Sequence, residues 1–379
     1  MNGIPLLDLD LCRARQQRLL SRLAAAPGGA PDLVVLTSPE HVQYLTGHRW
    51  DYRWARAPLV AIDSQARVLL VCPDREVELA AADDLRVYQS KWRSTLRLDQ
   101  RQASAALLGD WLLSRGPRSK VAVEFSACCP HVTRLFPDAS LVDVDPVLWD
   151  LRRRKDADEL ALLRRAIDAT GAMYRTARAM IEPGVSELAV FSSLQAAAVE
   201  SCGEMITDTG NDYASGVRGG APRPRGARAG ELYILDLGPA YRGYFADNAR
   251  TLSVDRRPTD AQYQAWKRVC GAFAIVERMG RPGVRCQDIY AAVHDWLNAT
   301  PKLGAWDSHL GHGIGLFVHE TPHLNPSWDD VLAEGDVIAV EPALYGPDLE
   351  VGIRIENDYL VTASGLELLS PFPLSLVED

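Results

Sequence analysis

Two stretches in the C-terminal half decide the fold, and each predicts a β-hairpin with an acidic residue on both strands. The first is ELYILDLGPAYRGYFADNARTLSV, residues 231–254, in which two β-rich runs flank a turn that contains proline and glycine. With the turn centred just before Arg242, Asp236 and Asp247 become cross-strand partners with Cβ atoms about 5 Å apart. Two like charges so placed destabilise a sheet unless a cation lies between them.

The second hairpin is VIAVEPALYGPDLEVGIRIENDYLVT, residues 337–362. With its turn centred just after Asp348, Glu341 and Glu356 also become cross-strand partners. Arg354 shares the face of Glu356, because strand residues two apart point to the same side. Each acidic pair alone is also typical of a solvated face. Together, and next to apolar runs, the four carboxylates predict a site that can hold two divalent ions.

Four of the eight histidines fall in one glycine-rich stretch, SHLGHGIGLFVHETPH, residues 308–323. The glycines on either side of His312 let the backbone pack closely around that residue. A lone histidine is more often structural than a metal ligand, but a histidine in an acidic domain with two such hairpins is a better ligand candidate. Mixed carboxylate and imidazole ligation suits Mn, Co, Fe or Zn better than Ca or Mg.

The 379-residue chain has an ordinary globular composition, with 47% hydrophobic and 24% charged residues. At about 150 residues per domain, its length predicts two domains. The net charge of −9 argues against nucleic-acid and anionic-membrane partners. No apolar run approaches the roughly 20 residues of a membrane span. The N-terminus does not resemble a signal peptide, and the seven cysteines form no C-x-x-C pair, so we expect a reduced, cytoplasmic protein.

The two halves of the chain carry different patterns. Residues 1–150 alternate short apolar strands with helical patterns, which predicts an α/β domain. Residues 151–379 group helices and antiparallel strand pairs in blocks, which predicts an α+β domain. The expected strands of the first half lie at 33–37, 59–62, 68–71 and 121–123, with a helix at 104–113. The expected helices of the second half lie near 157–181, 185–201, 260–279 and 286–298, with Asp156 or Asp158 as the cap of the first.

The motifs together resemble metallopeptidase family M24, which includes methionine aminopeptidase, aminopeptidase P, prolidase and the metal-free creatinase. They are D-x-G with a second aspartate eleven residues on, GHGIGL-x-x-HE-x-P, EP-x-x-Y and G-x-R-x-E. The resemblance extends to TSPEHVQYLTGH, residues 37–48, which is similar to the N-terminal domain of creatinase-type proteins. It implies a creatinase-like N-terminal domain, residues 1–150, and a catalytic domain with the pita-bread fold, residues 151–379.

The resemblance also implies a dinuclear metal centre, with manganese expected first and cobalt, zinc or iron as alternatives. It implies that a metal-bridging hydroxide cleaves an amide, while Glu341 shuttles the proton and His319 stabilises the oxyanion. His309 and Arg354 are further candidates for substrate contacts. The family's five metal ligands match Asp236, Asp247, His312, Glu341 and Glu356.

Three positions depart from the family pattern near the expected substrate pocket. In the loop VRGGAPRPRGARAG, residues 217–230, Arg223 takes the place of a histidine and Arg218 that of an asparagine. Ala249 replaces the threonine of D-x-T-R. Arginines in such a loop are usually solvated, but a guanidinium can also bind an anion and cannot shuttle a proton. Arg223 is therefore a candidate substrate contact, and we expect ordinary Xaa-Pro dipeptides to be poor substrates.

An aromatic stripe lies in RWDYRWAR, residues 49–56, where Trp50, Tyr52 and Trp54 alternate with other residues. Core or dimer packing is the ordinary explanation of such a stripe. In creatinase-like dimers, an N-terminal loop reaches the active site of the partner. The resemblance therefore implies a homodimer, in which Trp50 and Trp54 are candidate substrate contacts.

Three functions stay open at this stage. We favour a metal-dependent Xaa-Pro-type peptidase related to aminopeptidase P and prolidase, because it explains the five ligands and His319. A C–N hydrolase of the creatinase or ectoine hydrolase type, or a lyase, acting on a small non-peptide molecule would explain Arg223 and Ala249. A non-catalytic binding protein would have no need of a complete ligand set. Metal analysis separates the third hypothesis from the others, and a substrate panel separates the first two.

Overall fold

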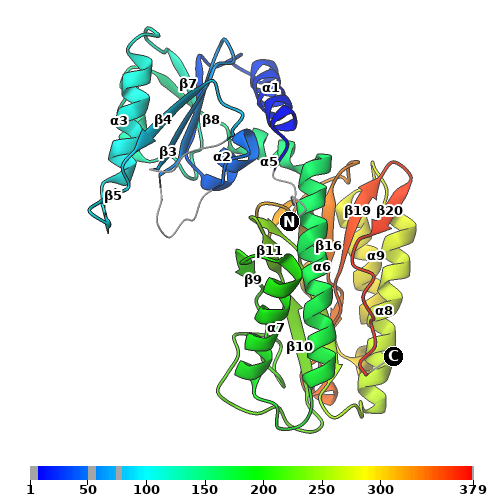
Figure 1. The fold of residues 1–379 in the computed structure, drawn as a ribbon. Helices are drawn as coiled ribbons and strands as arrows, with labels where there is room; N and C mark the ends of the chain where they lie inside the picture. The colour runs from blue at the N-terminus through cyan, green and yellow to red at the C-terminus, as the bar shows by residue number, and fades with distance from the viewer. Residues whose placement is uncertain (1–6, 50–56, 74–78, 378–379) are drawn as a thin grey trace. The chain divides into compact units, whose positions relative to one another are not determined.

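The computed structural model describes residues 7–49, 57–73 and 79–377 (Figure 1). The chain divides into two compact units, Met1–Arg152 and Arg153–Asp379. Among the described residues, no helix has both the length and the apolar character needed to cross a membrane.

Unit 1 is an α/β domain built on a mixed six-stranded sheet with the order β4-β3-β2-β1-β7-β8. Its three central strands are buried along their whole length, as expected for apolar runs covered on both faces. The strands are β1 (Leu33–Leu36), β2 (Leu59–Asp63), β3 (Val68–Pro73), β4 (Asp84–Tyr88), β7 (Lys120–Val123) and β8 (Ser140–Asp143), with a small hairpin of β5 (Lys91–Trp92) and β6 (Thr95–Leu96). The helices are α1 (Leu9–Ala25), α2 (Pro39–Thr46), α3 (Gln100–Leu112), α4 (Pro130–Thr133) and α5 (Asp145–Arg153).

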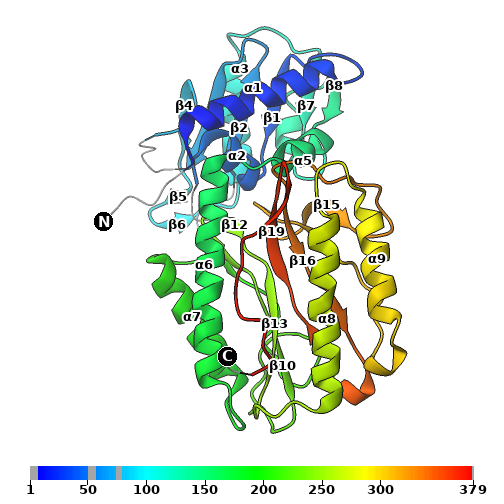
Figure 2. The same ribbon diagram turned by 90° about the vertical axis from the view of Figure 1, so that its right-hand side faces the viewer.

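Unit 2 contains two helix pairs, which lie on opposite sides of its strands in the view of Figure 2. The pairs are α6 (Ala157–Met180) with α7 (Glu187–Cys202), and α8 (Asp260–Met279) with α9 (Cys286–Asn298). All four helices were predicted, with ends within two residues of those observed. Asp156 is the N-cap of α6, and its backbone N–H donates to the Glu159 carboxylate at 2.9 Å in a capping box.

The strands of unit 2 form several small sheets. The largest has five strands in the order β15-β14-β16-β19-β20, and β10 pairs with β13. These seven strands are β10 (Leu232–Leu237), β13 (Asn248–Ser253), β14 (Gly311–Gly313), β15 (Glu320–Leu324), β16 (Val337–Val340), β19 (Asn357–Thr362) and β20 (Gly365–Leu368). Short strands complete the unit: β9 (Asp208–Thr209), β11 (Pro239–Tyr241), β12 (Tyr244–Phe245), β17 (Ala343–Leu344) and β18 (Ile353–Arg354). Two single 3₁₀ turns are η1 (Pro301–Leu303) and η2 (Pro347–Leu349).

The first predicted hairpin forms, but its register differs from the prediction. Asp236 lies opposite Ala249, not Asp247, so the expected direct pairing of the two aspartates is wrong. The reason is the turn, which is the dipeptide Arg242-Gly243 with φ of 51° and 86°. Positive φ at both positions is the type I′ geometry that matches the twist of a hairpin. Moving the turn centre by one residue moves each cross-strand partner by two.

The second predicted hairpin has the expected register. Val340 pairs with Asn357 on one side of the acidic positions, and Ala343 pairs with Arg354 on the other. Glu341 and Glu356 therefore lie opposite each other, between two paired segments. The Glu356 backbone N–H donates to the carbonyl of Ala249 at 2.9 Å, which joins the second hairpin to the first.

Candidate metal centre

The five predicted ligands come together in unit 2, although each lies at a different strand. Together with His319 they form three overlapping groups, and the ligand atoms within each group lie within 4.8 Å of one another. The groups are Asp236, Asp247 and Glu356; His312, Glu341 and Glu356; and Asp247, His312 and His319. The acidic residues lie at or next to the ends of β10, β13, β16 and β19, whereas His312 lies within β14.

The orientation of His312 suits a metal ligand. Its Nδ1 lies 3.1 Å from the Gly313 carbonyl oxygen, which can only accept, so Nδ1 donates and Nε2 keeps its lone pair. That Nε2 lies 3.6 Å from an oxygen of Asp247 and 3.6 Å from one of Glu341. Both separations are too long for a hydrogen bond. They are close to the roughly 3.4 Å that separates two ligand atoms when each lies about 2.1 Å from the same tetrahedral ion.

Burial sets the protonation of the cluster in the absence of a cation. Burial raises the pKa of Asp236 to about 6, against the pull of Arg354. Burial, and then the nearby Asp236, raises the pKa of Asp247 well above its usual range. The pKa of Glu356 is likewise well above its usual range, because of burial and the charge of Asp247. Burial lowers the pKa of His312 to about 4, so its imidazole is neutral at pH 7 and available as a ligand.

Two buried carboxylate oxygens in the cluster have no hydrogen-bond partner, and they are Oδ1 of Asp236 and Oε2 of Glu356. A buried carboxylate oxygen without a partner is costly, and a divalent cation would remove that cost. The unpartnered oxygens, the raised carboxyl pKa values and the free His312 Nε2 therefore fit a metal centre.

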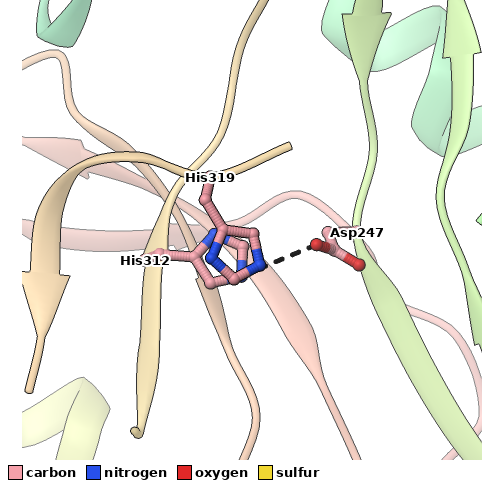
Figure 3. A group of neighbouring side chains, drawn as sticks. All are labelled: Asp247, His312 and His319. Carbon is pink, nitrogen blue, oxygen red and sulfur yellow. Dashed lines mark ion pairs between the residues drawn. The ribbon is translucent and has the colours of Figure 1, made fainter. Parts of the chain in front are cut away.

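Two further histidines line the centre. Figure 3 shows the His319 ring stacked on that of His312, with ring centroids 3.7 Å apart, and Asp247 facing them. Burial and the nearby His309 lower the pKa of His319. His309 Nε2 lies 3.0 Å from Glu341 Oε1. This hydrogen bond raises the pKa of His309, and against the effect of burial it lowers that of Glu341.

A buried ion pair holds Glu320, the residue after His319, and was not predicted. Lys155 Nζ is 3.1 Å from Glu320 Oε2, and both side chains are almost fully buried. A Cβ at Gly315 would lie only 2.7 Å from the same oxygen, so the backbone packs closely around Glu320. The pair anchors Glu320, the first residue of β15, which directly follows His319.

Arg354 contacts the centre from the second hairpin. Its Nη2 lies 2.9 Å from Asp236 Oδ2 and also donates to Asp212 Oδ2. Arg354 is thus shared by two carboxylates. Arg354 lies beside the cluster, as its place on the second hairpin predicts. Asp212 was not predicted, because nothing in its local sequence marks it.

Arg223 is engaged elsewhere. Its guanidinium makes a bidentate ion pair with Glu187, with N–O distances of 2.6 and 3.0 Å, and the Glu187 side chain is fully buried. Because Glu187 pairs with Arg223, the charge of Arg223 is not free to act on a substrate. The expectation that Xaa-Pro dipeptides are poor substrates stays a prediction. Trp50 and Trp54 lie outside the described residues, so their substrate role also stays a prediction.

Comparisons with known proteins assign the family. Residues 161–363 match the model of metallopeptidase family M24. The chain belongs to this family. Residues 15–154 match the creatinase/prolidase N-terminal domain. The recognition from motifs is confirmed, as is the pairing of an α/β N-terminal domain with a pita-bread domain, and the protein is a hydrolase of this metallopeptidase family.

The relatives are peptidases. The uncharacterized peptidase YqhT of Bacillus subtilis is 30% identical over 247 residues, which cover 64% of this chain and 69% of that protein. An uncharacterized peptidase of Staphylococcus epidermidis is 27% identical over 356 residues, which cover 90% of this chain and 95% of that protein.

Among solved structures, the Xaa-Pro dipeptidase from Bacillus anthracis aligns with a TM-score of 0.80 and 23% identity, covering 97% of this chain and 99% of that one. The prolidase from Pyrococcus furiosus aligns with a TM-score of 0.75 and 22% identity, covering 90% and 97%. These likenesses establish the fold. Peptidases of this family depend on two metal ions, and the acidic groups of this chain could bind them.

Proposed function

We propose that the protein is a metal-dependent Xaa-Pro-type peptidase that uses two divalent ions. The observation that carries the proposal is the convergence of four carboxylates and His312, with unpartnered buried oxygens on Asp236 and Glu356. The Xaa-Pro dipeptidase and prolidase among the structural neighbours favour a proline-containing peptide as the substrate.

The five clustered side chains would hold the ions, whose chemistry is to activate water and to polarise the scissile carbonyl. Glu341 would accept the proton, because the hydrogen bond from His309 lowers the pKa of Glu341 against the effect of burial and so keeps its carboxylate ionised near neutral pH. His319, neutral at pH 7, would donate a hydrogen bond to the developing oxyanion. Arg354 would keep Asp236 ionised and oriented, and His309 would contact the substrate.

A substrate panel tests this function. We expect the manganese-loaded protein to cleave at least one Xaa-Pro peptide, and the metal-free protein to cleave none. Manganese is our first choice of metal, and cobalt, zinc and iron are to be compared with it. Cleavage of creatinine-type or other cyclic amides without cleavage of any peptide would instead support the second candidate function, a C–N hydrolase of small non-peptide molecules. Ala249, in the place of the family's threonine, is the observation that favours that alternative.

The stability of the protein should depend on pH differently with and without metal. In the folded, metal-free protein the pKa of Asp236 is about 6, above its ordinary 3.8. The folded state therefore holds this proton more tightly than the unfolded state, and stability falls as pH rises through this interval. Metal ions bind the deprotonated carboxylates, so their stabilisation grows as pH rises. We expect the difference in Tm between manganese-loaded and metal-free protein to be larger at about pH 7.5 than at about pH 5. An equal difference at both pH values would contradict this.

We also propose a homodimer and a cytoplasmic location. Both follow from the family resemblance and the sequence, and the described residues contain seven free cysteines, which suits a reducing compartment. Light scattering is expected to give about twice the chain mass of 41.7 kDa. A fully active monomer would rule the dimer requirement out.

A further inference from the structure

A loop joins the two stacked histidines of the candidate metal centre. His312 lies in β14, His319 directly precedes β15, and residues 314–319 belong to no helix or strand. The two rings nevertheless stack with their centroids 3.7 Å apart and their planes 12° apart (Figure 3). Because no regular element holds this loop, its individual contacts must fix where the His319 imidazole points.

The carboxylate of Glu320 holds the loop at two points. Its Oε1 accepts from the backbone N–H of Phe317 at 3.2 Å. Its Oε2 packs so closely on Gly315 that a Cβ there would lie 2.7 Å from it. The carbonyl of Gly315 in turn accepts from the backbone N–H of Phe245 at 2.8 Å, two residues before the predicted ligand Asp247. The orientation of one carboxylate therefore sets the path of the loop.

Lys155 fixes that carboxylate. Its Nζ lies 3.1 Å from Glu320 Oε2, and only 1% and 2% of the two side chains are exposed. Removing one partner of such a buried ion pair leaves an uncompensated charge, so Glu320 would not keep its place without Lys155. Lys155 is itself firmly placed, because its backbone N–H donates to the Gly335 carbonyl at 3.2 Å and the next residue, Asp156, is the N-cap of α6.

We propose that Lys155 is a positioning residue, which sets the orientation of His319 through Glu320. The proposal rests on the proposed function, in which His319 donates a hydrogen bond to the developing oxyanion. Such a donor is effective only when it lies about 2.7–3.1 Å from the oxyanion. A displacement of about 1 Å at a reacting group can cost about 100-fold in rate. Lys155 thus contributes to the rate without binding metal or substrate.

The test is the double variant Lys155→Met/Glu320→Leu, which replaces the pair by apolar side chains of similar volume. Such replacements are often tolerated where the loss of one partner is not. In the manganese-loaded full chain, with a peptide that the wild type cleaves, kcat should fall by about 10-fold or more. KM and metal content should change little. In a His319→Ala background, the same double replacement should change kcat by less than about two-fold, because its effect passes through His319.

A milder variant, Glu320→Gln, covers the case in which the double variant does not fold. A glutamine has one acceptor oxygen, so it cannot accept from both Phe317 and Lys155. It should show the same pattern with a smaller loss of kcat. Arg164→Gln/Glu367→Gln is the matched control, because it removes an exposed ion pair of 2.6 Å that also starts on α6. It should keep the wild-type kcat in both backgrounds.

NMR of the histidine-labelled, metal-free protein follows the position of His319 without activity. Its ring signals, which are assigned by their loss in His319→Ala, should be shifted upfield in the wild type by the stacked His312 ring. In Glu320→Gln and in the double variant they should move towards those of a free histidine, whereas in the control they should not move.

Unchanged His319 signals and an unchanged kcat in the folded variants would overturn the proposal, as would an equal loss of kcat with and without His319. Loss of metal in proportion to activity would also overturn it, because Lys155 would then support the metal centre as a whole. If the wild type cleaves no peptide, the proposed function fails, and the NMR comparison alone decides whether Lys155 positions His319.

Discussion

Replacing Asp247 by asparagine should abolish metal binding and activity without destabilising the metal-free protein. The side chain belongs to two of the three ligand groups, so its loss removes an oxygen from both. We expect kcat/KM to fall by more than about 100-fold. Removing a residue that only hydrogen-bonds to a metal ligand costs up to about 100-fold in metal affinity or activity, and removing a ligand itself should cost more. Burial and the nearby Asp236 raise the pKa of Asp247, which means that they disfavour its charged form. The neutral amide of asparagine avoids that charge in the metal-free protein. The Tm of that state should therefore stay the same or rise.

Elemental analysis after manganese loading, steady-state kinetics and thermal unfolding check the three parts of this prediction. Asp329→Asn is a suitable control, because Asp329 is exposed and lies outside the cluster. An Asp247→Asn protein that retains two ions and full activity would remove Asp247 from the ligand set. A large fall in the Tm of the metal-free protein would show that its carboxylate is structural.

Replacing His319 by alanine should lower kcat by about 100- to 1,000-fold, the usual cost of removing one oxyanion donor. The His319 ring stacks on that of His312, and its lowered pKa keeps it a neutral hydrogen-bond donor at pH 7. Its proposed task is to stabilise the transition state, so metal content should not change and KM should change little.

The matched control is His323→Ala. That imidazole comes from the same segment, but it is held by Asp330 at 2.8 Å and stacks on Trp328. Its loss should change kcat by only a few fold. If His319→Ala loses metal in proportion to activity, His319 is a ligand, not an oxyanion donor.

The sequence predicts most of the site because its residues stand in local patterns. The second hairpin was predicted in register, since Gly346 and Pro347 mark its turn clearly. The first was shifted by two residues, because its turn uses Arg242 in a left-handed conformation that arginine rarely adopts. Its two aspartates nevertheless meet at the cluster, since a two-residue shift keeps a side chain on the same face.

Residues whose role depends on distant partners were not predictable from one sequence. Asp212 meets Arg354 across 142 positions, and Lys155 meets Glu320 across 165. No periodicity or local motif encodes such pairs. The ion pair of Arg223 with Glu187 spans 36 positions and was missed for the same reason. In unit 1, α2 was missed because its eight residues are too few for a helical repeat of apolar residues to be told from a short apolar run.

The central claim is that the two hairpins and His312 hold two divalent ions. The most direct measurement is an anomalous difference map from crystals of the manganese-loaded protein. We expect two peaks among the side chains of Asp236, Asp247, His312, Glu341 and Glu356. An empty cluster in fully loaded crystals, or peaks only elsewhere in the molecule, would contradict the account.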